Sequence, residues 1–172
     1  MKWLVLIAFA GVAHADPVPS LDTGGSFGAA YHAPGDLVTR FGLRVTVGAA
    51  WPDWHLGLVA TLEGEHGPGS TTGVASIGVD SVVRFTDDLW AHALVEKDAH
   101  SARGFESELG LRWTQGMGWV GLDAIGRTLS CSGCDMHAAY GLAASIGYQA
   151  EGTYTLAIGV LLEALIIGGS SL

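Results

Sequence analysis

Charged side chains recur in this sequence at alternate positions within apolar segments, and such residues could form ion pairs or relay protons. The set contains both signs: Arg44, Glu63, Asp80, Arg84, Glu96, Glu106, Glu108, Arg112, Asp123 and Arg127. Charges in a confined interior must be paired, because removing one partner typically costs several kcal/mol. We therefore expect a structural polar network inside the fold. A narrow conduit or a proton-linked site is the functional alternative.

The alternation that positions these charges predicts β-strands. Apolar and polar residues alternate over 41–51, 54–63, 75–85, 105–113, 140–149 and 154–162, and less regularly over 89–98 and 119–129. Successive side chains of a strand point to opposite faces. The charged set should therefore occupy one face, while Val45, Ile77, Leu111 and Ile158 occupy the other. A ninth candidate strand, 25–32, carries Phe27, Ala29 and Tyr31 in phase.

The composition is unusual for a soluble domain. Hydrophobic residues make up 49% of the 172 residues, charged residues only 15%, and there are 26 glycines. No apolar run is long enough for a clear membrane helix, but alternating strands can place apolar surface against lipid in a closed barrel. The formal net charge of −9 argues against nucleic-acid binding through a basic face.

The first fifteen residues have the features of an export signal. Lys2 precedes an apolar stretch from Trp3 to Val12, and Ala13-His14-Ala15 has the small-x-small form that signal peptidase cleaves. We expect residues 1–15 to be a removed signal peptide, the mature chain to begin at Asp16, and residues 16–172 to form one barrel domain.

The connections between the expected strands alternate in length. Short ones at 52–53, 87–88, 116–118 and 150–152 take turns with longer ones at 64–72, 99–104 and 130–136. Aromatic residues flank the short turns, and six are in phase with the apolar face: Trp51, Trp54, Phe85, Trp113, Tyr148 and Tyr154. A belt of rings at one edge of an apolar band is typical of a membrane–water interface.

This pattern, over residues 25–165, resembles the small Gram-negative outer-membrane β-barrels of the OmpA and OmpX type. The expected fold is all-β, an up-and-down antiparallel transmembrane barrel of about eight strands, within a range of eight to ten. Such barrels have an even number of strands, whereas the sequence offers nine candidates. One segment is then not a strand, or the two rims are reversed, or a closing piece is missing.

Two cysteines, Cys131 and Cys134, lie in one of the longer connections. Export to an oxidising compartment favours a disulfide between them. His137 extends the motif to a Cys-x-x-Cys-x-x-His cluster that could bind a soft metal, but a fourth ligand is not evident. Asp135 stands where haem attachment requires His. We expect no metal and no cofactor.

Two other motifs could be catalytic. Leu21-Asp22-Thr23-Gly24 matches the short aspartic-protease signature, but no second such motif supplies the partner Asp. We interpret this segment as a turn-rich leader. His100 and Ser101 lie near Glu106, in an arrangement that differs from the His-x-Ser pattern of lipid A deacylases. We expect no catalytic residue.

These observations lead to one main functional hypothesis and two alternatives. We expect a non-enzymatic outer-membrane barrel with a structural or surface-interaction role. Its expected partners are membrane lipid, lipopolysaccharide and the outer-membrane assembly machinery. One alternative is a lipid-modifying outer-membrane enzyme of the lipid A deacylase kind. The other is a soluble periplasmic barrel that binds an apolar ligand.

Overall fold

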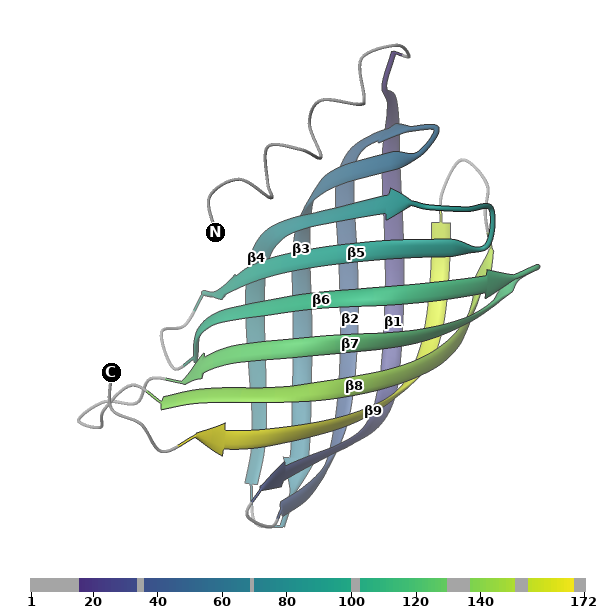
Figure 1. Ribbon diagram of the computed structural model, residues 1–172. Helices are drawn as coiled ribbons and strands as arrows, with labels where there is room; N and C mark the ends of the chain where they lie inside the picture. The colour runs from purple at the N-terminus through teal and green to yellow at the C-terminus, as the bar shows by residue number, and fades with distance from the viewer. Residues whose placement is uncertain are drawn as a thin grey trace.

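The structure, a computed structural model of the chain, is an all-β closed barrel (Figure 1). It describes residues 16–33, 36–68, 70–99, 103–129, 137–150 and 155–168. The strands are β1 (Val18–Ala33), β2 (Asp36–Trp51), β3 (Trp54–Gly67), β4 (Ser70–Arg84), β5 (Leu89–Asp98), β6 (Arg103–Gln115), β7 (Gly118–Leu129), β8 (His137–Ala150) and β9 (Thr155–Gly168). The predicted all-β barrel of eight to ten strands is confirmed.

The barrel closes through one parallel pair, which the antiparallel expectation did not include. Strands β1 to β8 each pair antiparallel with the next strand, whereas β1 and β9 pair in parallel from Asp22↔Thr155 to Ala33↔Ile166. An up-and-down chain of nine strands has its first and last strands pointing the same way, so parallel pairing is the only way these two edges can join. A closed barrel leaves no unpaired edge.

The first strand is longer than the candidate segment 25–32. Leu21-Asp22-Thr23-Gly24, expected to be a turn-rich leader, lies within β1 and pairs with Arg44 to Val47 of β2. That interpretation was wrong because small and polar residues can join a ladder through their backbone groups alone. The segment is held by β2 on one side and by β9 on the other.

The two rims of the barrel differ in their connections. We call the rim with connections 52–53, 85–88, 116–117 and 151–154 the tight-turn rim, and the opposite rim, with 34–35, 68–69, 99–102 and 130–136, the loop rim. The expected loop over 64–72 is largely strand: Glu65 pairs with Thr72, and His66 with Thr71, whose hydroxyl lies 2.8 Å from the His66 ring. These polar residues continue the two strands through their backbone groups: Thr71 and Thr72 are exposed, whereas Glu65 is buried in the interior.

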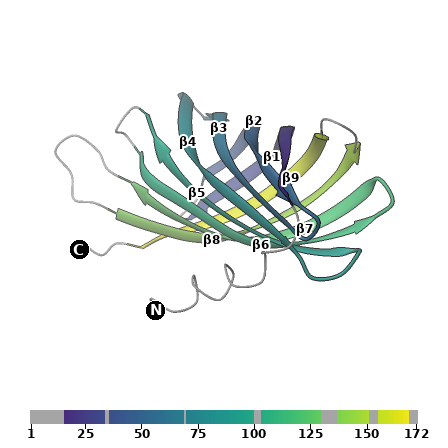
Figure 2. The same ribbon diagram turned by 90° about the horizontal axis from the view of Figure 1, so that it is seen from above.

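The inner and outer faces of the barrel have opposite character. Along the outside, large apolar side chains are exposed, as at Leu58 (71%) and Ile77 (65%). Inside, Arg40 and Glu96 are each only 3% exposed. Figures 1 and 2 show a single layer of strands, and no other element of the described ranges covers the outer face. None of the described residues forms a helix long and apolar enough to cross a membrane.

Candidate functional site: the barrel interior

Some of the predicted interior charges line a common cavity, and the others form a cluster beside it. A cavity of about 780 Å³ is lined by Arg44, Glu63, Asp80, Arg84, Glu108, Arg112 and Asp123. Glu106 and Arg127 lie nearer the loop rim, where they contact each other, and Glu96 is buried at the same level. All of these side chains project from the inner face, as the period-two phase requires.

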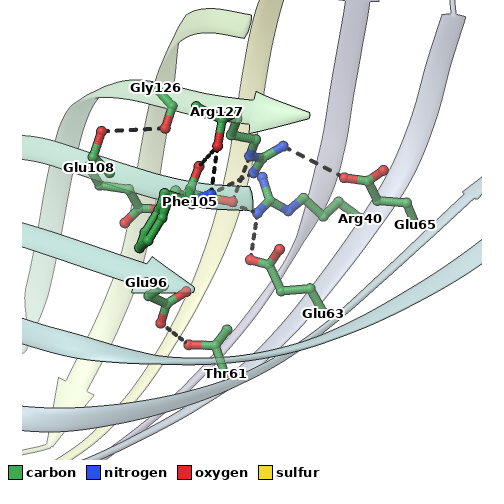
Figure 3. A network of polar contacts seen from close by, with 12 residues as sticks. Arg40, Thr61, Glu63, Glu65, Glu96, Phe105, Glu108, Gly126 and Arg127 are labelled. Atoms are coloured by element: carbon green, nitrogen blue, oxygen red, sulfur yellow. Dashed lines mark hydrogen bonds and ion pairs between the residues drawn. The ribbon is translucent and has the colours of Figure 1, made fainter. Parts of the chain in front are cut away.

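An ionic cluster fills the interior near the loop rim (Figure 3). Arg127 donates two hydrogen bonds to Glu106, Nε to Oε2 at 2.7 Å and Nη2 to Oε1 at 2.9 Å. Arg40 lies 2.5 Å from Glu63 and 3.6 Å from Glu106, while Arg127 also lies 3.8 Å from Glu65. Two guanidinium groups from β2 and β7 thus share three carboxylates from β3 and β6. Paired fork-and-carboxylate contacts of this kind are among the strongest hydrogen bonds in proteins.

Two members of this cluster, Arg40 and Glu65, were not predicted from the sequence. Arg40 is in phase with Arg44 but lies one position before the predicted segment 41–51. Glu65 fell in the expected loop 64–72. Extending the alternation two steps back from Arg44, through Gly42, and one step forward from Glu63 would have found both.

Polar contacts continue toward the middle of the barrel. Arg44 lies 3.3 Å from Glu108. The hydroxyl of Thr61 donates a hydrogen bond to Glu96 (Figure 3). These contacts join β2 to β6 and β3 to β5, strands that are not neighbours in the sheet. The interior contacts therefore brace the barrel across its lumen.

A His–carboxylate bridge lies closer to the tight-turn rim. Nε2 of His92 on β5 lies 2.5 Å from Oδ1 of Asp123 on β7, so the bridge passes over the intervening strand β6. Gly110 occupies the crossing point, where a Cβ atom would lie 1.8 Å from Asp123 Oδ1 and 2.6 Å from His92 Nε2. The absence of a side chain at position 110 makes this contact possible.

Two further arginines stack on tryptophan rings. The Arg84 guanidinium lies 4.2 Å from the Trp90 ring centre, and that of Arg112 lies 4.4 Å from the Trp119 ring centre. Among the described residues, neither arginine forms an ion pair within 4.0 Å. Indole faces attract cations electrostatically, which offsets part of their desolvation. Trp90 and Trp119 are the two aromatic residues near the tight turns that are out of phase with the predicted belt, and both point inward.

A Ser–His–Asp group lies at the opening on the tight-turn rim. Ser20 Oγ is 2.8 Å from His55 Nε2, and Asp22 Oδ2 is 3.4 Å from the same nitrogen. A catalytic triad needs the acid and the nucleophile on different ring nitrogens, so that the acid orients the base. This arrangement therefore fits a polar contact between β1 and β3 rather than a proton relay.

The expected aromatic belt lies at the tight-turn rim as far as it is described. Trp51 and Trp54 stack across their turn with ring centres 4.7 Å apart, and Trp54 Nε1 donates to Ser81 Oγ at 2.9 Å. Phe85, Trp113 and Tyr148 are exposed on the outside. Tyr154 lies outside the described residues. The described rings all lie at or next to the tight turns.

Several predicted features lie outside the described residues: the signal peptide 1–15, His100, Ser101, and the cysteines Cys131 and Cys134. The disulfide stays a prediction. The side chain of Ile158 is also not described, whereas Val45, Ile77 and Leu111 are exposed on the outer face. Within the described part of the chain, no three His, Cys, Asp or Glu side chains are grouped as metal ligands would be.

Comparison with known proteins does not assign the chain to a family. No protein-family model matches it, and neither a curated protein nor a solved structure is detectably similar. Its function must therefore be argued from the barrel and its two faces.

Proposed function

We propose that this chain is a transmembrane β-barrel of a Gram-negative outer membrane, with a structural or surface-interaction role and no catalytic activity. The observation that carries the proposal is the distribution of side chains over the two faces of the barrel, which is the reverse of that in a water-soluble protein. Large apolar side chains are exposed around the outside, as at Phe27, Leu58, Ile77, Leu109 and Ile146, while charged groups fill the inside. A water-soluble barrel would have no reason to expose so much apolar surface, since large exposed apolar patches are uncommon on soluble monomers.

The rims support an orientation in the membrane. Outer-membrane barrels have short periplasmic turns and longer external loops. Successive strands are separated by up to seven residues at the loop rim and by at most four at the tight-turn rim. The tight-turn rim, with its aromatic residues, would therefore face the periplasm, and the loop rim would face outward. The export signal expected at residues 1–15 agrees with this location. Lipid around the barrel, lipopolysaccharide in the outer leaflet and the outer-membrane assembly machinery are the proposed partners.

The interior favours an anchoring role over the two alternatives. An apolar ligand would meet Arg44, Asp80 and Arg112 in the cavity, and each would lose water without gaining a polar partner. For the enzyme alternative, the Ser20–His55 contact lacks the geometry of a triad. The cross-lumen ion pairs instead stabilise a closed barrel, which suits a structural or surface-interaction role.

Cell fractionation combined with gel mobility tests this proposal. The full chain, expressed with its leader in a Gram-negative host, should appear in the outer-membrane fraction and migrate differently before and after boiling, because folded barrels resist detergent unfolding. Recovery as a monomer in the soluble periplasmic fraction, with no change in mobility on boiling, would reject the membrane assignment.

A further inference from the structure

The half of the interior near the tight-turn rim contains hydrogen-bond donors that have no acceptor in the part of the chain that the structure describes. In the register, Arg84 is opposite Trp90, and Trp90 is opposite Arg112, so the three lie side by side on β4, β5 and β6. Trp119 then covers Arg112 from β7. Three donor atoms of this group, Arg84 Nε, Trp90 Nε1 and Trp119 Nε1, are buried without a partner among the described residues. Arg84, Trp90, Arg112 and Trp119, which we call the arginine–tryptophan row, all line the 780 Å³ cavity.

The nearby carboxylates do not serve this row. Asp123 is bound to His92, and Glu108 to Arg44. Asp80 precedes Arg84 by four residues on β4, a separation of about 13 Å between Cα atoms. Buried cations normally have a carboxylate partner, because an uncompensated buried charge is costly. Asp80 lines the same cavity and its Oδ1 is also buried without a hydrogen-bond partner among the described residues, but it forms no ion pair with either arginine of the row. The row thus presents two cations and two indole N–H groups to the cavity.

We propose that the arginine–tryptophan row binds the phosphate group of a small solute that enters from the tight-turn rim. A guanidinium fork donates two parallel hydrogen bonds to phosphate oxygens, and a tetrahedral phosphate has enough oxygens for two forks and an indole N–H. A cavity of about 780 Å³ lies within the range of small-molecule sites. This goes beyond the proposed function, since an anchoring barrel needs no ligand.

Other charged groups that line the cavity affect how strongly the site would prefer phosphate to other anions. His55 and His92 also line the cavity, with Asp22 and Asp123 as their partners. Among the described residues, five carboxylates line the cavity, those of Asp22, Glu63, Asp80, Glu108 and Asp123, and they oppose the entry of an anion, so binding rests on the forked hydrogen bonds of Arg84 and Arg112. Charge alone would attract chloride as well as phosphate, whereas forked hydrogen bonding favours the oxyanion. Phosphate should therefore compete effectively against chloride at equal ionic strength.

Ligand-observed phosphorus NMR tests the proposal with inorganic phosphate as the probe. The folded full-length barrel is held in a neutral maltoside detergent, which contains no phosphate, and sodium chloride keeps the ionic strength constant. Wild type should broaden the phosphate line saturably. Arg84→Gln and Arg112→Gln should each weaken binding by about tenfold or more, as expected for the loss of a charge-assisted hydrogen bond.

Matched variants separate a specific site from general charge. Lys97→Gln removes one positive charge from the outer face, where Lys97 lies 5.9 Å from the Phe105 ring centre, and should bind phosphate as wild type does. Arg84→Lys and Arg112→Lys keep the charge and the fold but lose the fork, so they should bind several-fold more weakly. Barrel folding is verified for each by gel mobility without boiling.

The proposal is overturned if wild type shows no saturable broadening, or if the arginine variants and Lys97→Gln behave alike. A second arm uses vesicles of anionic phospholipid with no free phosphate, and monitors the emission of the cavity tryptophans. An Arg112-dependent change there, without any effect of inorganic phosphate, would assign the contact to a lipid headgroup and reject the free solute.

Discussion

Arg127 and Arg112 lie on the same inner face of neighbouring strands, yet their surroundings differ completely. Arg127, near the loop rim, is held by both oxygens of Glu106 and shares its cluster with Arg40 and Glu63. Arg112, near the tight-turn rim, rests on the Trp119 ring and faces the cavity. One half of the interior is closed by ion pairs, and the other is hollow.

The difference shows that the inward-pointing residues determine whether each part of the lumen is filled by ion pairs or left as a cavity. The backbone ladder continues through both halves, and apolar side chains are exposed over both, as at Phe105 and Trp113 on the two ends of β6. The same barrel wall thus carries a brace at one end and a cavity at the other. The ion pairs connect the strands across the lumen at one end, and the cavity at the other end has room for a ligand.

The largest expected effect comes from breaking the brace. Arg127→Met should destabilise the barrel by about 3–5 kcal/mol, because Glu106 would lose its bidentate partner in a buried site. Arg112→Met removes only a ring contact and should cost about 0.5–2 kcal/mol. Urea unfolding of both variants in lipid vesicles, followed by far-UV circular dichroism, measures the two losses. Equal losses would contradict the division into two halves.

A smaller effect is expected at the crossing point of the His–carboxylate bridge. Gly110→Ala would push a methyl group between His92 and Asp123, and breaking this hydrogen bond should cost about 1–3 kcal/mol. Gly73→Ala is the matched control, since its Cβ would meet only the Glu63 carbonyl oxygen at 3.8 Å. The control should change stability by less than about 0.5 kcal/mol. If the two variants unfold at the same urea concentration, the bridge does not stabilise the barrel.

The smallest expected effect distinguishes two tryptophans. Trp54→Phe removes an N–H that donates to Ser81 and should cost about 0.5–1.5 kcal/mol. Trp119→Phe keeps an aromatic ring beside Arg112 and removes an N–H that has no partner among the described residues, so in the absence of ligand its cost should be lower. The same unfolding assay ranks them. A larger loss at Trp119 would contradict this ranking, and would mean that its N–H is bonded within the barrel or that the smaller ring leaves a cavity at this buried position.

The sequence predicted the phase of the strands better than their partners. The alternation of Arg44 with Val45 was enough to assign one to the inside and the other to the outside. It could not predict that Arg44 meets Glu108, or that Arg40 meets Glu106, because contacts across the lumen depend on strand tilt and register. The parallel closure of β1 on β9 was missed for a different reason: the sequence left the strand number open between eight and ten, and only an odd number makes the first and last strands parallel. Asp22 was misplaced because its segment pairs through the backbone and shows little apolar alternation.

The central claim, that the apolar face meets lipid, can be tested by spin labelling. Nitroxides are attached to cysteines replacing Ile77 and Leu111, after Cys131 and Cys134 have been changed to Ser, and the folded barrel is placed in phospholipid vesicles. We predict that both labels collide more with oxygen, which concentrates in the hydrocarbon, than with a water-soluble nickel complex. Collision rates dominated by the nickel complex at both positions, in a protein shown to be folded, would contradict the claim.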